Sequence, residues 1–148
     1  MNTAQAVLIV DDDEIMRSST AQILRLNGYR VSTAFDGQEA LAQLRAAAPP
    51  CLILLDLNMP VMDGFTFRVQ QQLDPALSDI PVVLVSGAAN LPEEAIRLGV
   101  ADFVQKPADP IELLSLVGDY AHRSAARALS LRRCKPKVRN NPRRGGIL

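Results

Sequence analysis

The stretch CLILLDLNMPVMDGF, residues 51–65, decides the fold, because it joins a buried strand to a polar loop through one aspartate. Its apolar run LILL (52–55) has the continuity of a central strand in a parallel sheet, which is buried on both faces. Asp56 follows this run directly, and Asp63-Gly64 is typical of the turn before a helix. A buried strand that ends on a lone carboxylate requires a partner for that charge.

Four further short runs predict strands, and helical patterns separate them. Continuously apolar residues at 6–10 and 80–86 predict central strands, whereas the mixed patterns at 29–34 and 101–105 predict edge strands. The alternation indicates an α/β fold with a doubly wound parallel sheet, and the flavodoxin-like strand order 2-1-3-4-5 puts both mixed strands at the edges. Helices are expected at 14–27, 38–48, 65–72 and 92–98, and from 110 to about 122 or beyond.

In that order the first and third strands are neighbours, and ligands bind beyond their carboxyl ends. Asp11 and Asp12 follow the first strand, so their carboxylates should lie beside Asp56. Two carboxylates about 4 Å apart repel by roughly 4 kcal/mol at an effective dielectric near 20, so three of them need a cation or shared protons. Because no His or Cys directly follows a predicted strand at this end of the sheet, Mg²⁺ with oxygen ligands is expected rather than zinc.

Two more polar residues follow predicted strands at the same edge of the sheet. Ser86 closes the fourth strand, and Lys106 follows the fifth, just before Pro107. Considered alone, Ser86 would be a strand-end residue that hydrogen-bonds backbone groups, and Lys106 would be a solvent-exposed surface lysine. A metal site, a hydroxyl and an ammonium group together are the parts that manage a phosphoryl group. Asp56 is then the expected acceptor, because carboxylates form acyl phosphates.

Four motifs together resemble the response-regulator receiver domain of two-component signalling, over roughly residues 5–122. The resemblance implies that Asp56 is the phosphoacceptor. It also implies that Asp12 and Asp56 bind Mg²⁺ directly, helped by the backbone carbonyl of Asn58, with Asp11 acting largely through water. The motifs are VLIVDDDEIMR (7–17), LILLDLNMPVMDG (52–64), VVLVSG (82–87) and DFVQKP (102–107).

The same resemblance implies roles for residues of the last two strands. Ser86 would hydrogen-bond a phosphoryl oxygen, Lys106 would pair with the phosphoryl charge, and the Lys106–Pro107 peptide bond would be cis. Phe103 matches the switch aromatic of the family, although an edge-strand Phe is otherwise simply a core residue.

The function implied by the resemblance is a phosphorylation-dependent signalling switch. A sensor histidine kinase or a histidine phosphotransfer protein would donate the phosphoryl group. The output face would comprise the helix at 92–98, the strand at 101–105 and the helix from 110, acting on a downstream protein or forming a homodimer. We expect self-catalysed phosphoryl transfer and dephosphorylation only, and no enzyme with a separate substrate.

The net charge of zero hides two regions of opposite charge. Residues 1–122 hold 7 basic and 16 acidic residues, a net charge of −9, whereas residues 123–148 hold 9 basic and no acidic residues. Together with the resemblance, this division predicts a receiver domain over 1–122 and a basic C-terminal helix extension with a flexible tail over 123–148. The basic segment could stay solvated, fold back on the acidic body, contact a partner protein or bind nucleic acid weakly through clustered Lys and Arg.

Two other functions remain open at this point. Asp11 and Asp13 supply the Asp-x-Asp of Mg²⁺-dependent phosphatases of the haloacid dehalogenase type, but Glu14-Ile15 does not continue that motif. A nucleic-acid-binding regulator that works through the basic segment is the other alternative. No apolar run reaches the roughly 18 residues of a membrane span, and the two cysteines match no metal or redox spacing, so a cytoplasmic location is expected.

Overall fold

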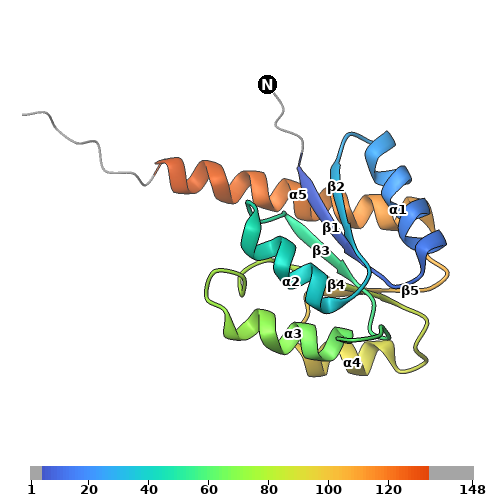
Figure 1. The fold of residues 1–148 in the computed structure, drawn as a ribbon. Helices are drawn as coiled ribbons and strands as arrows, with labels where there is room; N and C mark the ends of the chain where they lie inside the picture. Colours follow the sequence, from blue (N-terminus) through green and yellow to red (C-terminus); the bar gives the residue numbers. More distant parts are fainter. Residues whose placement is uncertain (1–4, 134–148) are drawn as a thin grey trace, which may run out of the picture.

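The structure is a computed structural model, and it describes residues 5–133. Five strands alternate with five helices in this part of the chain (Figure 1). All the strand pairs are parallel, and the order is β2-β1-β3-β4-β5, which confirms the predicted doubly wound α/β fold. The elements are β1 (Ala6–Val10), α1 (Glu14–Leu26), β2 (Arg30–Ala34), α2 (Gly37–Ala46), β3 (Leu52–Leu55), α3 (Gly64–Leu73), β4 (Val82–Ser86), α4 (Leu91–Leu98), β5 (Asp102–Gln105) and α5 (Pro110–Arg133).

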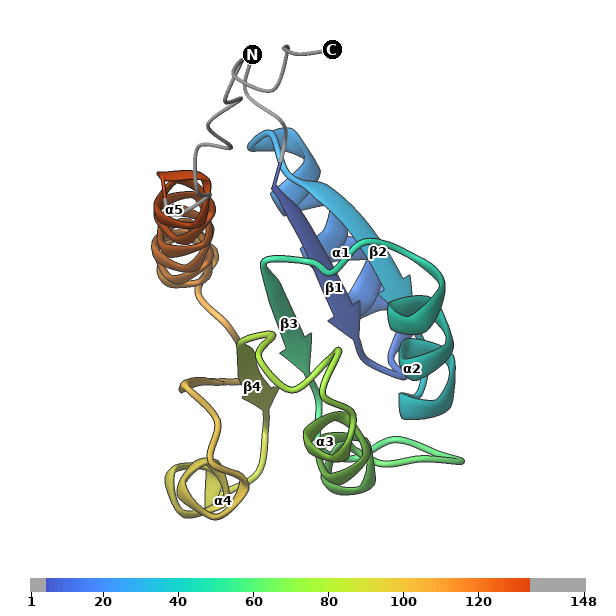
Figure 2. The ribbon, with the colours of Figure 1, turned by 90° about the vertical axis from the view of Figure 1, so that its left-hand side faces the viewer.

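The sheet separates two apolar cores, because successive strand residues point to opposite faces. In β1, Leu8 and Val10 belong to the core under α2, α3 and α4, whereas Val7 and Ile9 belong to the core under α1 and α5. Figure 2 shows these two groups of helices on the two sides of the sheet. The central strands β1 and β3 are almost wholly buried. The edge strand β2 is exposed at alternate positions near its start, and the edge strand β5 is exposed at most of its positions.

Aspartates begin several of the helices just after the sheet. The carboxylates of Asp13, Asp36 and Asp63 accept backbone N–H groups in the first turns of α1, α2 and α3. Asp109 likewise accepts the N–H of Ile111 at 2.8 Å, directly before the proline that begins α5. These caps satisfy N–H groups that have no partner within the helix, and so they fix where each helix leaves the carboxyl end of the sheet.

The last helix is the element whose length the sequence indicated least well. α5 continues to Arg133 and projects past the sheet (Figure 1), so the first part of the basic segment is helical. The flexible tail predicted for the remainder, 134–148, lies outside the described residues. β4 begins at Val82 rather than at residue 80, after Pro81, which has no N–H to donate to a neighbouring strand. None of the helices within residues 5–133 combines the length and apolar character needed to cross a membrane.

Candidate functional site

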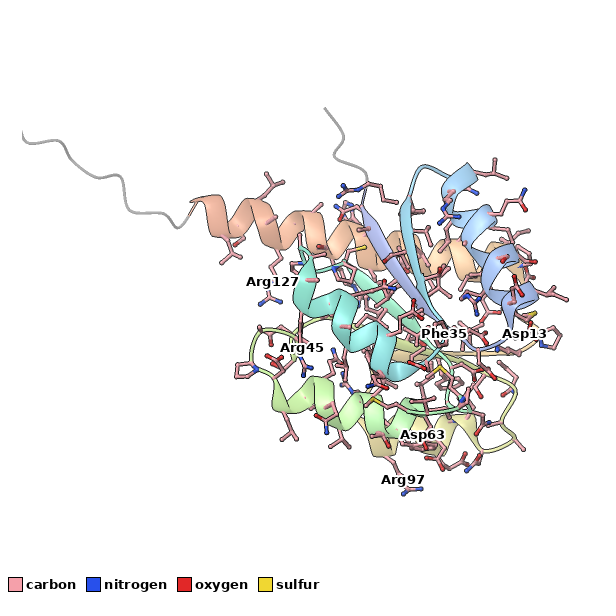
Figure 3. All side chains as sticks on the ribbon, viewed as in Figure 1. Asp13, Phe35, Arg45, Asp63, Arg97 and Arg127 are labelled. Carbon is pink, nitrogen blue, oxygen red and sulfur yellow. The ribbon has the colours of Figure 1, made fainter. Side chains whose placement is uncertain are left out.

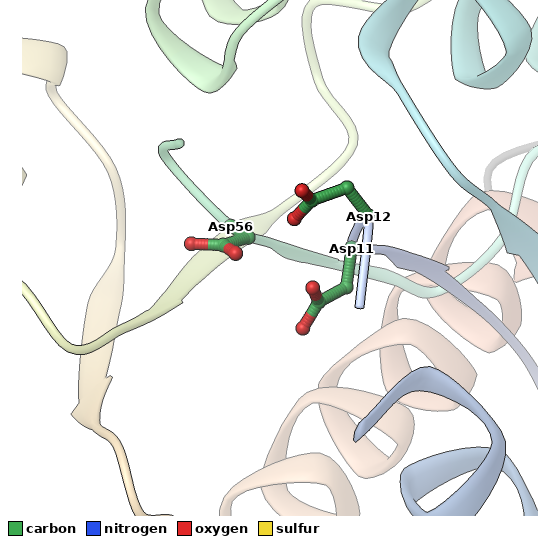
Figure 4. Close-up of side chains that lie close together, drawn as sticks. All are labelled: Asp11, Asp12 and Asp56. Carbon is green, nitrogen blue, oxygen red and sulfur yellow. The ribbon is translucent and has the colours of Figure 1, made fainter. Parts of the chain in front are cut away.

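Three carboxylates meet at the carboxyl end of the two central strands. Val10 and Leu55 are partners in the β1–β3 register, and the N–H of Asp56 donates to the carbonyl of Val10 at 2.9 Å. Asp11, Asp12 and Asp56 each place one carboxylate oxygen so that all three oxygens lie within 4.8 Å of one another (Figure 4). The neighbouring strands therefore bring together the acids that the sequence predicted to meet.

The three acids differ in their exposure to solvent. Asp11 and Asp56 are buried, with 7% and 8% of their surface exposed, whereas Asp12 is exposed. The backbone holds the two buried residues in place, because Asp11 N–H donates to Ala34 at 3.1 Å and Leu57 N–H donates to Asp56 Oδ1 at 2.7 Å. Two fixed carboxylates thus form the inner wall of the pocket, and Asp12 borders the solvent.

Lys106 supplies the positive charge in this pocket. Its Nζ donates to Asp11 Oδ2 at 2.8 Å and to Asp56 Oδ2 at 3.2 Å. The backbone N–H of Lys106 donates to the carbonyl of Ser86 at 2.9 Å, which ties the lysine to the end of β4. The Lys106–Pro107 peptide bond is cis. With one ammonium group against three ionised carboxylates, the pocket would carry an excess of two negative charges.

At both Asp56 and Lys106, burial and the charge of the partner shift the pKa in opposite directions. Burial raises the pKa of Asp56 above its ordinary value; the Lys106 charge opposes that rise, and the Asp11 charge adds to it. Burial alone would lower the pKa of Lys106, but the hydrogen bonds and charges of Asp11 and Asp56 outweigh it and raise that pKa. The lysine is therefore held firmly as a cation, while the phosphoacceptor candidate lacks full charge compensation.

A glycine next to the pocket has a positioning role that sequence reasoning missed. The sequence pattern predicts only that Gly64 belongs to a turn before a helix. A Cβ atom at this position would overlap the backbone carbonyl oxygen of Asp56 and approach the Leu57 Cα to 2.8 Å. Gly64 N–H also donates to the carbonyl of Leu57 at 2.9 Å. Absence of a side chain therefore allows α3 to begin against the strand end that carries Asp56.

The other predicted site residues lie on three different segments: Ser86 at the end of β4, Asn58 in the loop after β3, and Phe103 in β5. Ser86 is 1% exposed at the end of β4, and its Oγ accepts the N–H of Ala88 at 3.3 Å. Asn58 is an exposed residue in the loop two positions after Asp56. Phe103 is not part of the acidic pocket: it lies on β5 with 37% of its surface exposed, opposite Leu84 in the register.

The donor set of the pocket fits a small divalent cation. Its ligands would be carboxylate oxygens, which suit Mg²⁺, and one exposed side leaves room for the waters that this ion keeps. The raised pKa of Asp56 is consistent with a site where added positive charge would be favourable. Among residues 5–133, these three acids are the group whose geometry could hold a metal ion.

Comparison with known proteins agrees with this geometry. A family model described as "Response regulator receiver domain" matches residues 7–118. The transcriptional regulatory protein PrrA of Mycobacterium leprae is 37% identical over 126 residues, which cover 84% of this chain and 53% of PrrA. The response regulator PleD of Caulobacter vibrioides is 39% identical over 113 residues, 75% of this chain and 25% of PleD. The chain thus spans about half the length of PrrA and a quarter of PleD.

Two solved structures of similar shape are matched over nearly their whole length. The chemotaxis response regulator CheY4 of Vibrio cholerae superposes with a TM-score of 0.72 at 32% identity, covering 80% of this chain and 99% of CheY4. A putative response regulator from Chloroflexus aurantiacus gives a TM-score of 0.75 at 28% identity, covering 81% and 99%. The order of the strands, the acids at their ends and the family match agree, and the chain belongs to the response regulator receiver domain family of two-component systems.

Proposed function

We propose that this chain is a phosphorylation-dependent signalling switch whose phosphoacceptor is Asp56. The observation that carries the proposal is the placement of Lys106 Nζ between the carboxylates of Asp11 and Asp56, with Asp12 beside them. This arrangement offers a nucleophilic oxygen, a fixed cation and a cluster of acids at one edge of the sheet. In a receiver domain, these are the groups that phosphoryl transfer requires.

The transfer follows from the chemistry of these side chains. An unprotonated oxygen of Asp56 attacks the phosphorus of a phosphohistidine, and the new O–P bond forms as the N–P bond to the imidazole breaks. The released imidazole takes up a proton from solvent. Lys106, already hydrogen-bonded to Asp56 Oδ2, then lies beside the charged phosphoryl oxygens. Hydrolysis later returns the Asp56 carboxylate and inorganic phosphate.

Mg²⁺ is the proposed cofactor, and it would neutralise charge on the phosphoryl oxygens when bound. Asp12 and Asp56 would hold it directly, with the backbone carbonyl of Asn58 and with Asp11 acting largely through water. The all-oxygen donor set and the exposed side chain of Asp12 support this assignment.

The output of the switch would pass from Ser86 to the face formed by α4, β5 and α5. The Ser86 hydroxyl would donate to a phosphoryl oxygen, and Phe103 would turn inward in concert. The partial exposure of Phe103 and the high exposure of Ile96 (82%) and Ile111 (78%) support an apolar surface there for a downstream protein or a second copy. A ligand shifts such an equilibrium only through its differential affinity for the two states.

The proposed donor is a sensor histidine kinase or a histidine phosphotransfer protein, in the cytoplasm. PrrA is a transcriptional regulatory protein, and it is about twice as long as the region that matches this chain. For the present chain, the proposed downstream partner is a protein that binds the face formed by α4, β5 and α5.

A phosphatase of the haloacid dehalogenase type receives less support. That interpretation needs the Asp13 carboxylate to take part in the chemistry. Here Asp13 Oδ1 accepts the N–H groups of Ile15 and Met16 at 3.0 and 3.1 Å, and so it caps α1. The buried acid that shares the pocket with Asp11 is instead Asp56, directly after β3.

The direct test is labelling with acetyl phosphate and Mg²⁺, followed by mass measurement of the intact protein. The wild type should gain one phosphoryl group, and Asp56→Ala should gain none. Asp74→Asn is the matched control, because it removes a carboxylate that lies outside the pocket and should label like the wild type. Labelling of Asp56→Ala to the wild-type extent would refute the assignment.

A further inference from the structure

An enclosed cation lies outside the acidic pocket, between α3 and the C-terminal end of α4. Arg68 of α3 has only 7% of its surface exposed. Its Nε donates to the carbonyl of Leu98 at 3.1 Å and its Nη2 to the carbonyl of Gly99 at 2.9 Å. Leu98 is the last residue of α4, and Gly99 is its C-cap. The guanidinium group therefore binds the C-terminal end of α4.

Two glutamines complete the hydrogen bonding of this network. Arg68 Nη1 donates to Gln71 Oε1 at 2.8 Å, and the Gln72 amide, turned so that its oxygen faces the guanidinium, accepts from Nη1 and Nη2 at 2.9 and 3.0 Å. Gln71 is fully buried, and its Nε2 donates to the carbonyls of Leu77 and Ile80 at 3.0 Å each. Both residues lie in the connection between α3 and β4. The network thus connects the end of α4 to the segment that enters the central part of the sheet.

The charge of Arg68 is compensated by the helix end rather than by an acid. Its partners within the described part of the chain are carbonyl and amide oxygens, and burial lowers the pKa of its guanidinium. The C-terminal end of a helix carries partial negative charge, so α4 offers favourable electrostatics as well as acceptors. Moving the end of α4 away from Arg68 would leave an enclosed cation short of partners, which is unfavourable.

The N-terminal end of α4 is held differently. The N-cap residue Asn90 makes no side-chain capping hydrogen bond; its Nδ2 donates to Glu94 Oε1 at 2.8 Å instead. The connection before it is tied to the candidate phosphoryl site, because Ser86 Oγ accepts the N–H of Ala88 at 3.3 Å. One end of α4 is therefore fastened to α3 by a buried network, and the other end follows the switch serine.

We propose that Arg68 is a positioning residue that anchors the C-terminal end of α4, so that the switch moves this helix at its N-terminal end. The movement rests on the proposed phosphorylation of Asp56, whereas the anchor is a property of the unmodified protein. A change at Ser86 then tilts α4 about the anchor and alters the part of the output face nearest to the phosphoryl site. Arg97, which points outward from α4 (Figure 3), is not part of the anchor and is 73% exposed.

The anchor is tested first by amide hydrogen exchange, measured by NMR on the unmodified full chain. The amides of Gly99 and Val100, which bond back into α4, should exchange about tenfold faster in Arg68→Met, the change expected for one lost hydrogen bond of ordinary net strength. Arg68→Lys, which keeps the charge but not the planar fork, should restore part of the protection. Arg45→Met is the control, because Arg45 is 54% exposed and bonds only Asp74 at 3.4 Å among the described residues.

Unchanged exchange at Gly99 and Val100 in Arg68→Met would overturn the anchor. A merely structural role would predict faster exchange throughout the domain, so a uniform increase at both ends of α4 would overturn it as well. Where Arg68→Met does not fold, Arg68→Lys, which keeps the enclosed positive charge, replaces it, and unchanged exchange of Gly99 and Val100 in that variant would overturn the anchor as well.

The movement is tested by adding beryllofluoride with Mg²⁺ as a mimic of the phosphoryl group. In the wild type, exchange should change more over residues 88–94 than over 95–100; in Arg68→Met, both ranges should change. Equal changes at both ends of the wild-type helix would overturn the proposal. Absence of any change near Asp56 would instead refute the phosphorylation function, and the unmodified-protein comparison would still judge the anchor.

Discussion

Lys106 and Arg68 are both largely enclosed cations, but their surroundings shift their pKa values in opposite directions. Lys106 donates to the carboxylates of Asp11 and Asp56, and their hydrogen bonds and charges raise its pKa despite burial. Arg68 donates to neutral oxygens, so burial alone acts and lowers its pKa. One cation sits in an excess of negative charge, and the other relies on carbonyl groups and a helix end.

This difference separates a binding site from a structural support. The acidic pocket keeps uncompensated negative charge, which would favour the proposed binding of a cation. The Arg68 network uses its donors on the protein itself, and no buried side-chain nitrogen or oxygen among residues 5–133 lacks a partner. A fully satisfied network has nothing left to offer a ligand, so its contribution is to hold elements together.

The largest effect on stability is expected from Lys106→Met. Removal of the ammonium leaves the carboxylates of Asp11 and Asp56 enclosed without their shared partner. Because the lysine side chain is 19% exposed, we expect a loss of about 2–3 kcal/mol of unfolding free energy, somewhat below that of a fully buried pair. Urea unfolding at pH 7 measures this loss, and a variant as stable as the wild type would contradict the ion pair.

The pH dependence of that loss has a defined sign. Since the folded-state pKa of Lys106 lies above 10.5, its stabilisation is complete below pH 10.5 and disappears as pH rises through the folded-state value. The difference between the wild type and Lys106→Met should therefore be constant from neutral pH to about pH 10 and shrink at higher pH. A difference that widens above pH 10.5 would reverse this assignment.

Gln71→Leu should cost about 1–3 kcal/mol, because it orphans the carbonyls of Leu77 and Ile80 and one donor of Arg68. Addition of Mg²⁺ should not change this loss, unlike a defect in the acidic pocket. Gln70→Leu is the matched control on the exposed side of α3. In the double variant Arg68→Met with Gln71→Leu, the loss of unfolding free energy should be smaller than the sum of the two single losses.

Asp56→Asn should stabilise the unmodified protein at pH 7.5 in the absence of Mg²⁺. The reason is that burial raises the pKa of Asp56, so the folded state disfavours the ionised carboxylate. The gain should shrink as pH falls toward 3.8, because wild-type Asp56 then takes up a proton in the folded state. Thermal or urea unfolding across this range tests the sign, and a gain that grows on acidification would exclude it.

The smallest effect is expected from Asp12→Asn, whose exposed side chain should change the unfolding free energy by less than about 0.5 kcal/mol without Mg²⁺. With Mg²⁺ at 100 times its dissociation constant, the wild type should gain about 2.7 kcal/mol, and the variant should gain clearly less. Asp13→Asn is the matched control, because it removes one negative charge at the neighbouring position and asparagine is also a good N-cap residue. Equal gains in all three proteins would remove Asp12 from the cation site.

The fold and most of the pocket could be predicted because the deciding signals are local in the sequence. The apolar runs of β1 and β3 each end directly on aspartates, and strand adjacency then places those acids together. Lys106 could be included because β5 ends beside β4 at the same edge. The length of α5 was indicated less well, since nothing in the sequence before Arg133 forces that helix to end.

The Arg68 network could not be predicted from the sequence. Arg68 and Gln71 have the spacing of ordinary polar neighbours on one side of a helix, where most such residues face water. Their burial depends on where the end of α4 lies, and that position follows from tertiary packing. Gly64 was similarly hidden, because a turn glycine and a glycine pressed against the Asp56 backbone have the same local pattern.

The β1–β3 register limits how this chain can change during evolution. Asp11 and Asp56 each follow the register pair Val10 and Leu55 by one position. An insertion of one residue inside β3 would advance Asp56 by about 3.3 Å and turn its side chain to the other face of the sheet. We therefore expect one-residue insertions and deletions to be tolerated in the connections at the amino ends of the strands but not inside β1 or β3.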